Sequence, residues 1–243
     1  MKNSVSPYRF RDGFRDGISI GLGYLFVSFG FGVSAVGQGI RALETLVLSM
    51  TNLTSAGQVA GVAIIVAGGT LLEMFLTQLV INARYALMGI SLTQRMDSRF
   101  RTPHRMLLSF AITDEIFAVA SSKPYPIGSS YFSGLSTAPY LGWALGTLLG
   151  AYAVEIMPQS LQAAAGIMIY AMFIAIVLPP MKRERGVAIA VGIAAALSCL
   201  LYYVPLFDVI SSGFSIIICA VLAAVIAALL LPMDDKKEDE HAT

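Results

Sequence analysis

The chain has 243 residues, of which 56% are apolar and 13% are charged, whereas an ordinary soluble domain carries about 25% charged residues. The net charge of +1 gives no electrostatic basis for binding a nucleic acid, and the surplus apolar surface excludes a water-soluble domain because it needs lipid to cover it. Uncharged runs at 186–205 and 209–232 reach the roughly 20 residues that cross a bilayer as a helix. Lipid offers no hydrogen-bond partners, and these runs lack the alternation of barrel strands. The sequence therefore predicts an all-α polytopic membrane protein.

The N-terminal segment contains the tetrapeptide Phe-Arg-Asp-Gly twice in succession, at 10–13 and 14–17. Phenylalanines four residues apart, beside arginines, are typical of a helix at the membrane interface. We predict an interfacial segment at 1–16 and a first span at 17–39. That span is too long and glycine-rich for a cleaved signal peptide.

Lysine and arginine gather in four groups along the chain. The groups are Lys2, Arg9, Arg11 and Arg15; Arg95, Arg99, Arg101 and Arg105; Lys182, Arg183 and Arg185; and Lys236 with Lys237. The positive-inside rule places such groups on the cytoplasmic side. Both termini are therefore predicted to be cytoplasmic, including a charged tail at 233–243.

Three apolar segments lie between the first two basic groups, at 17–39, 43–68 and 69–92. Three full crossings would put the second basic group outside. The segment 43–68 is interrupted by the polar, glycine-bearing stretch 51–58, which a lipid-facing helix would avoid. We therefore interpret 43–68 as a re-entrant or broken segment.

The same count arises between the second and third basic groups, where apolar segments occupy 106–120, 140–157 and 161–178. A second re-entrant segment at 161–178 resolves it. The expected architecture is one transmembrane domain at 17–232, with about five full spans and two re-entrant segments. Its repeat halves, 17–92 and 140–205, would form an inverted repeat. In this scheme 106–120 is a linking span and 209–232 is the final span.

Carboxylates inside the membrane are costly, so they are functional candidates. Asp114 and Glu115 follow Thr113 within an apolar segment, and adjacent helical residues point about 100° apart. One of them is expected to meet a substrate ammonium or carry a proton, while the other pairs with Arg84 or a backbone group. In the alternative, the helix begins deeper and both carboxylates lie at the cytoplasmic interface.

The polar break in 43–68 is the second candidate. Helix-end amides there are suited to a substrate carboxylate, with orienting hydrogen bonds from neighbouring polar groups. The residues concerned are Asn52, Thr54, Ser55, Gly57 and Gln58. A polar extracellular loop is the alternative.

A third candidate group lies on the span 69–92, which carries Glu73, Asn82 and Arg84. Glu73 and Arg84 share a face but stand three turns apart, about 16 Å, and so cannot pair directly. Both are candidates for proton coupling or charge pairing, although Arg84 also fits a side chain that snorkels to the interface. Trp143, beside Tyr140, is typical of an aromatic belt.

The chain carries neither a G-x-x-x-x-G-K-[ST] phosphate loop nor an H-E-x-x-H metal motif. Neighbouring helical carboxylates diverge and cannot flank one scissile bond. Cys199 and Cys219 lie within apolar runs and are expected to be small buried hydrophobes. We therefore expect no enzyme activity, no cofactor and no metal site.

Short polar motifs in a fixed order resemble the AzlC family, the large subunit of bacterial branched-chain amino acid exporters linked to azaleucine resistance. The resemblance rests on Gly13-x-x-Asp16; Phe29 to Gly32; Ser49 with Ser55-Ala56-Gly57-Gln58; Asn82-x-Arg84-Tyr85-x-x-x-Gly89; Thr113-Asp114-Glu115-x-Phe117-Ala118; and Trp143-x-x-Gly146-Thr147-x-x-Gly150. Phe26 and Tyr170 stand where the family pattern has proline. The resemblance covers nearly the whole chain.

The resemblance implies export of branched-chain amino acids from a bacterial cytoplasm across the inner membrane, together with a small hydrophobic AzlD-like subunit. We expect the substrate side chain to lie among aromatic residues, including Phe29 and Tyr170, with a carboxyl proton as the coupling ion. A non-transporting scaffold or receptor subunit is the rival from another class. A channel for a small polar solute is the rival within transport.

Overall fold

The computed structural model describes residues 6–207 and 209–231, which fold into ten α-helices and a short 3-10 turn. The elements are α1 (Phe10–Gly37), α2 (Ala42–Thr51), α3 (Ser55–Val66), α4 (Leu71–Thr93), α5 (Thr102–Ser109), α6 (Asp114–Ser121), α7 (Ser129–Ala153), α8 (Gln159–Arg183), α9 (Arg185–Tyr203), η1 (Pro205–Phe207) and α10 (Ser212–Leu230). The all-α fold is confirmed. Lys2, the final basic pair and the tail at 233–243 lie outside the described residues.

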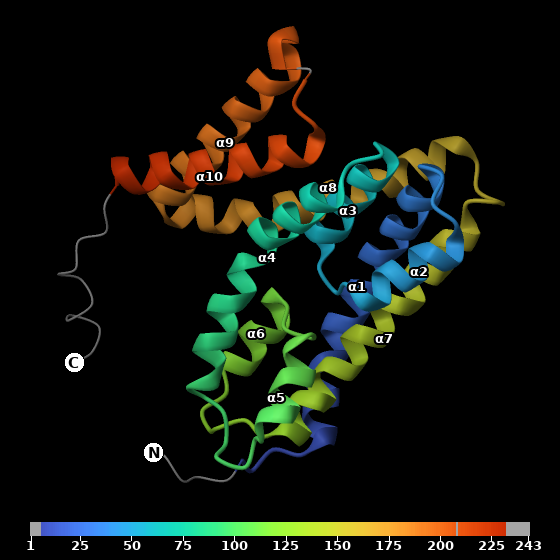
Figure 1. Cartoon of the computed structure of the whole chain (residues 1–243). Helices are drawn as coiled ribbons and strands as arrows, with labels where there is room; N and C mark the ends of the chain where they lie inside the picture. Colours follow the sequence, from blue (N-terminus) through green and yellow to red (C-terminus); the bar gives the residue numbers. More distant parts are fainter. Residues whose placement is uncertain (1–5, 208, 232–243) are drawn as a thin grey trace.

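The centre of the protein is a parallel pair of long helices, α1 and α7 (Figure 1). Glycines let their backbones touch: a Cβ atom at Gly17 would lie 2.5 Å from the carbonyl oxygen of Leu135, and one at Gly21 would lie 2.6 Å from that of Ala138. The partner numbers rise together, so the helices run in the same direction. Small residues at helix contacts are the usual means of close packing in lipid.

The end of the molecule where α1 begins is called the inner end here, and the opposite end the outer end. The described residues of the first two basic groups all lie at the inner end. Ser6 donates its backbone N–H to Asp97, at 2.6 Å, and Arg95 donates to the carbonyl of Lys123 at 3.2 Å. These contacts join the start of the chain to the loops before α5 and after α6, as the positive-inside rule requires.

Helices α2 and α3 form a hairpin that enters from the outer end and returns to it. Leu48 of α2 and Val62 of α3 pack with Phe31 and Ala35, near the end of α1. The break between them carries Leu53, which packs instead at the middle of α1 and α7. The segment 43–68, expected to be re-entrant or broken, is broken at 52–54 between α2 and α3.

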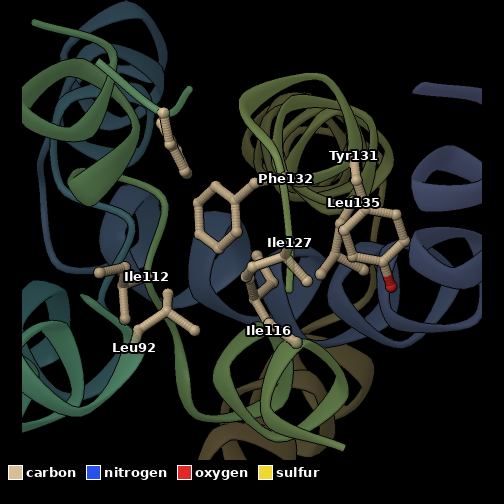
Figure 2. Packing of buried hydrophobic residues seen from close by; sticks show 9 residues of the cluster. Leu92, Ile112, Ile116, Ile127, Tyr131, Phe132 and Leu135 are labelled. Atoms are coloured by element: carbon tan, nitrogen blue, oxygen red, sulfur yellow. The ribbon is translucent and has the colours of Figure 1, made fainter. Parts of the chain in front are cut away.

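The second re-entrant hairpin is α5 with α6, and it enters from the inner end. Phe100, just before α5, and Ala120, near the end of α6, both belong to an apolar cluster with Phe132 in the first turn of α7. Figure 2 shows this cluster where the green and blue ribbons converge. Each helix has eight residues and rises about 12 Å, less than half of a bilayer core.

This hairpin corrects two expectations. The segment 106–120 is not a span, because its helix breaks at 110–113. The segment 161–178 is not re-entrant, because it lies inside α8, an unbroken helix of 25 residues. Charge counting required one re-entrant segment in this part of the chain, but apolar composition did not identify which.

Among the described residues, five helices are long and apolar enough to cross a bilayer, namely α1, α4, α8, α9 and α10. Helix α7 lies along α1 and so crosses the same depth. Because α1 and α7 run parallel, the halves 17–92 and 140–205 do not begin with oppositely directed spans. The opposed units are instead a hairpin followed by a span: α2, α3 and α4 from the outer end, and α5, α6 and α7 from the inner end.

Candidate substrate site

The tips of the two re-entrant hairpins meet at the middle of the protein. Leu53 from the outer hairpin and Ala111 from the inner hairpin pack together with Tyr24 of α1 and Trp143 of α7. Directly after each tip a threonine precedes a helix: Thr54 precedes α3 and Thr113 precedes α6. The N-termini of two short helices therefore border one central region.

The N-terminus of α6 is closed by its own polar side chains. The Thr113 hydroxyl accepts a hydrogen bond from the backbone N–H of Ile116 at 3.3 Å. The Tyr24 hydroxyl donates to the Glu115 carboxylate and lies 2.7 Å from Thr113 Oγ1, whose own proton can complete the chain. Glu115 is thus held by neutral groups.

Asp114 has a different environment from its neighbour. Its carboxylate forms an ion pair with Arg84 of α4, at 2.8 Å. Arg84 also donates to the Tyr85 hydroxyl at 3.1 Å, and its guanidinium lies 4.9 Å from the centre of that ring. The two adjacent carboxylates therefore point to different partners: Asp114 to a cation, Glu115 to hydroxyl groups.

The N-terminus of α3 has no such closure. Thr54 accepts no capping hydrogen bond from the helix, and its hydroxyl donates to Asn52 Oδ1 at 2.8 Å. The first amides of a helix have no partner within it. Gln58, fully buried on the next turn, accepts a hydrogen bond from Trp143 Nε1 at 3.0 Å, and its Nε2 has no partner among the described residues.

Helix α4 supports this open terminus from behind. Gln78 donates to the carbonyl of Gly57 at 2.8 Å, and Asn82 donates to Gln78 Oε1 at 2.9 Å. A Cβ atom at Gly57 would meet Thr54 Oγ1 and would lie 2.6 Å from Gln78 Oε1. A side chain here would therefore displace the ends of the Thr54 and Gln78 side chains and disturb the hydrogen bonds that they make.

A small cavity lies between the two helix N-termini, with a volume of about 20 Å³. Its walls are Tyr24, Leu53, Ser55, Tyr85, Thr113, Asp114, Glu115, Trp143, Met172 and Ile176. A single water needs about 10 to 15 Å³. The cavity therefore holds about one water, and the site is closed in this conformation.

Of the residues expected from sequence to bind substrate, Ser55, Asp114 and Glu115 line the cavity. Gln58 is hydrogen-bonded to the lining residue Trp143, and Gly57 and Asn82 are joined through Gln78. Asn52 accepts from Thr54, whose neighbour Ser55 lines the cavity. Arg84 reaches the cavity through Asp114.

The other predicted residues lie elsewhere. Glu73 is buried near the start of α4, where it accepts hydrogen bonds from Ser211 Oγ at 2.5 Å and from the Gly213 N–H at 2.9 Å. It caps α10. Phe29 and Tyr170 do not line the cavity, and Tyr170 has 60% of its surface exposed.

Sequence reasoning missed Tyr24, Tyr85 and Trp143 as lining residues. Trp143 is buried at 3% exposure, so it does not belong to an aromatic belt. Its position one turn after Tyr140 resembles a belt in the sequence, and only the packing against Gln58 distinguishes the two roles.

A larger apolar cavity of about 360 Å³ opens between α4, α5 and the start of α7, toward the inner end. Ile112 lines this cavity, and the next residue, Thr113, lines the small one. The break between α5 and α6 therefore lies between this larger cavity, called the inner vestibule here, and the small one.

A closed polar cavity between the tips of two opposed re-entrant hairpins is the arrangement of a membrane transporter, in which irregular backbone is tolerated only where it borders a substrate path. The profile of the AzlC protein family matches residues 19–157. The chain belongs to the AzlC family, and it is a multi-pass membrane protein with a role in transport.

Relatives with similar sequences are also membrane proteins. The chain is 28% identical over 226 residues to the inner membrane protein YgaZ of Escherichia coli, a match that covers 90% of this chain and 91% of that protein. An uncharacterized membrane protein of Archaeoglobus fulgidus is 29% identical over 191 residues, covering 78% of this chain and 84% of the relative. One from Helicobacter pylori strain 26695 is 29% identical over 196 residues, covering 79% and 84%. No solved structure matches the chain.

Proposed function

We propose that this protein is the large subunit of a two-component, proton-coupled exporter of branched-chain or related small apolar amino acids. The observation that carries the proposal is the unequal chemistry of the two helix N-termini at one cavity. One terminus has open amides beside Ser55, and the other carries Glu115. An amino acid has one group for each of them.

The substrate carboxylate binds at the N-terminus of α3 in this scheme. Open amides and the positive end of the helix dipole both favour an anion there. The buried Nε2 of Gln58 supplies a further donor once the tip moves, and Trp143 fixes the Gln58 amide in that orientation.

The substrate ammonium binds at Glu115. Asp114 is already neutralised by Arg84, so Glu115 is the carboxylate left to meet a cation. A proton and an ammonium cannot both hold the same carboxylate. Exchange of one for the other at Glu115 therefore couples export of the amino acid to entry of a proton.

The cavity volume supports a carrier over a channel, because the space between the two tips holds only about one water, too little for an open pore. Loading requires the α5–α6 tip to move, which would join the inner vestibule at Ile112 to the site at Thr113. Release to the outside requires the α2–α3 tip to move instead.

Everted membrane vesicles test the proposal directly, because export then appears as uptake of labelled leucine. We expect saturable uptake that needs both a proton gradient and a co-expressed small AzlD-like subunit. Glu115→Gln should abolish the dependence on the gradient and reduce uptake about 100-fold, which lies within the cost of about 2–5 kcal/mol for one lost buried charge contact.

Glu155→Gln is the matched control, since this carboxylate is exposed at the end of α7 and away from the cavity. It should leave uptake unchanged. Normal, gradient-dependent uptake by Glu115→Gln would contradict the assignment of the ammonium and proton site. Saturable uptake without any small subunit would contradict the two-component scheme alone.

A further inference from the structure

We infer that Met172 and Ile176 of α8 form the wall that selects the substrate by the size of its side chain. The inference rests on the proposed function and deepens it. It concerns residues that sequence patterns did not point to, since Phe29 and Tyr170 were expected in that role and do not line the cavity.

The cavity walls divide by chemistry. Helix α3, helix α6 and the Tyr24 hydroxyl supply its polar groups, and α8 supplies two wholly apolar side chains, Met172 and Ile176. The amino acid backbone is satisfied at the polar walls. Its side chain is therefore left to face α8.

Helix α8 presents one face to the cavity and the opposite face outward. Met172 and Ile176 are four residues apart and so lie on the same face. Ile174, between them in sequence, points the other way and has 64% of its surface exposed. Lipid therefore contacts one side of the helix, while the other side closes the site.

Helix α8 packs closely against α1 near its start, but it is partly exposed where it borders the cavity. A Cβ atom at Gly30 of α1 would lie 2.7 Å from the carbonyl oxygen of Ala165, and Ala165 and Ile169 are buried. Ile176, two turns further on, is 37% exposed although it borders the cavity. The wall has room to move outward.

Two consecutive prolines weaken the helix just after the wall. Pro179 and Pro180 lie inside α8 and have no N–H to donate to the carbonyls of Ala175 and Ile176. Proline is the commonest cause of a kink in a long helix. The backbone at Ile176 therefore lacks one of the restraints that hold the rest of α8 straight.

A movable wall explains how a cavity of about 20 Å³ can accept an amino acid. Methionine is flexible and fills irregular gaps, so Met172 can adapt to side chains of different shape. Ile176 is stiffer because it is branched at Cβ, and it sets the depth of the subsite.

Competition between substrates in everted vesicles, with the small subunit present, tests the inference. Alanine, valine and phenylalanine, each with a second label, compete with labelled leucine, so that the uptake of both substrates is counted. Met172→Ala and Ile176→Ala should each raise the ratio of phenylalanine to leucine uptake about 10-fold, the scale of a changed methylene in an apolar pocket. Ile176→Phe should shift the ratio toward alanine instead.

Ile174→Ala is the matched control on the outward face, and it should leave every ratio unchanged. A ratio is independent of the amount of folded protein, so a poorly expressed variant still reports selectivity. Equal effects on all substrates, or ratios that also change in Ile174→Ala, would overturn the inference. If the native chain transports no amino acid at all, the proposed function fails and this inference fails with it.

Discussion

The two re-entrant tips have the same shape and opposite chemistry. Each ends in a threonine that precedes a short helix, and both helices begin at one cavity. The α6 terminus is occupied by its own carboxylates and by a threonine cap, whereas the α3 terminus has neither. A pair of helix ends that would otherwise both attract anions is thus converted into a site for one anion and one cation.

The two tips are also held in place by different interactions. The inner tip is held by charge, through Arg84 and Asp114, and the outer tip is held by amide hydrogen bonds, through Gln78 and Trp143. The two tips should therefore fail in different ways. Four further changes follow from this difference, in decreasing order of expected effect.

Gly57→Ala should have the largest effect, because the new Cβ atom would displace the ends of the Thr54 and Gln78 side chains and break the hydrogen bonds that hold the α3 terminus. We expect leucine uptake in everted vesicles to fall more than about 100-fold through misplacement of the α3 amides. Gly166→Ala on α8 is the control, since nothing lies within 4 Å of its Cβ position. Equal losses in both variants would contradict the close-contact argument.

Arg84→Ala should leave Asp114 without its cation. Removal of one partner of a fully buried pair costs about 3–5 kcal/mol, and the partial exposure of this pair reduces the expected loss to about 2 kcal/mol. Thermal unfolding in detergent measures it. Adding Asp114→Asn should restore most of the stability, and no recovery in the double variant would show that Arg84 acts through other contacts.

Trp143→Phe should remove the hydrogen bond to Gln58 while keeping the aromatic packing on Tyr24. The unpartnered amide costs about 1–3 kcal/mol of stability, and its lost orientation should raise the KM for leucine. Adding Gln58→Leu should recover the stability but not the KM. Recovery of both would mean that Gln58 plays no part in binding.

Asp97→Asn should have the smallest effect and should spare both tips. Burial raises the pKa of Asp97, but hydrogen bonds from the N–H groups of Arg99 and Ser6 outweigh it, so its pKa is lowered on folding. A lowered pKa adds stability above the unfolded value of about 3.9, and this stability is lost as pH falls through the folded value. The variant should therefore unfold at a temperature a few degrees lower than the native chain at pH 7, and this difference should shrink as the pH falls below about 4. The KM for leucine should be unchanged.

Sequence reasoning found the outer tip because polar residues and a glycine interrupt an apolar run at 51–58. It did not find the inner tip, because the break at 110–113 reads Phe-Ala-Ile-Thr and has no helix-breaking residue. Thr113, Asp114 and Glu115 were still identified as exceptional, since their cost in lipid does not depend on the fold.

The residues that sequence could not assign depend on contacts between distant segments. Tyr24 meets Glu115 across 91 positions, and Trp143 meets Gln58 across 85. The sequence neighbours of these two aromatic residues are the same as those expected for an aromatic residue at the membrane interface. The misplaced Tyr170 shows the converse, because an aromatic ring in an apolar helix faces lipid as readily as substrate.

The close glycine contacts between α1 and α7 constrain how the protein is inserted into the membrane in the cell. Gly17 meets Leu135, so the first helix leaves the ribosome long before the partner that fills its groove. At about 5–20 residues per second, the delay is on the order of 6 to 24 s. During biogenesis, lipid or an insertion factor must therefore occupy the exposed glycine face of α1, and both re-entrant hairpins must wait for α7 before they can settle.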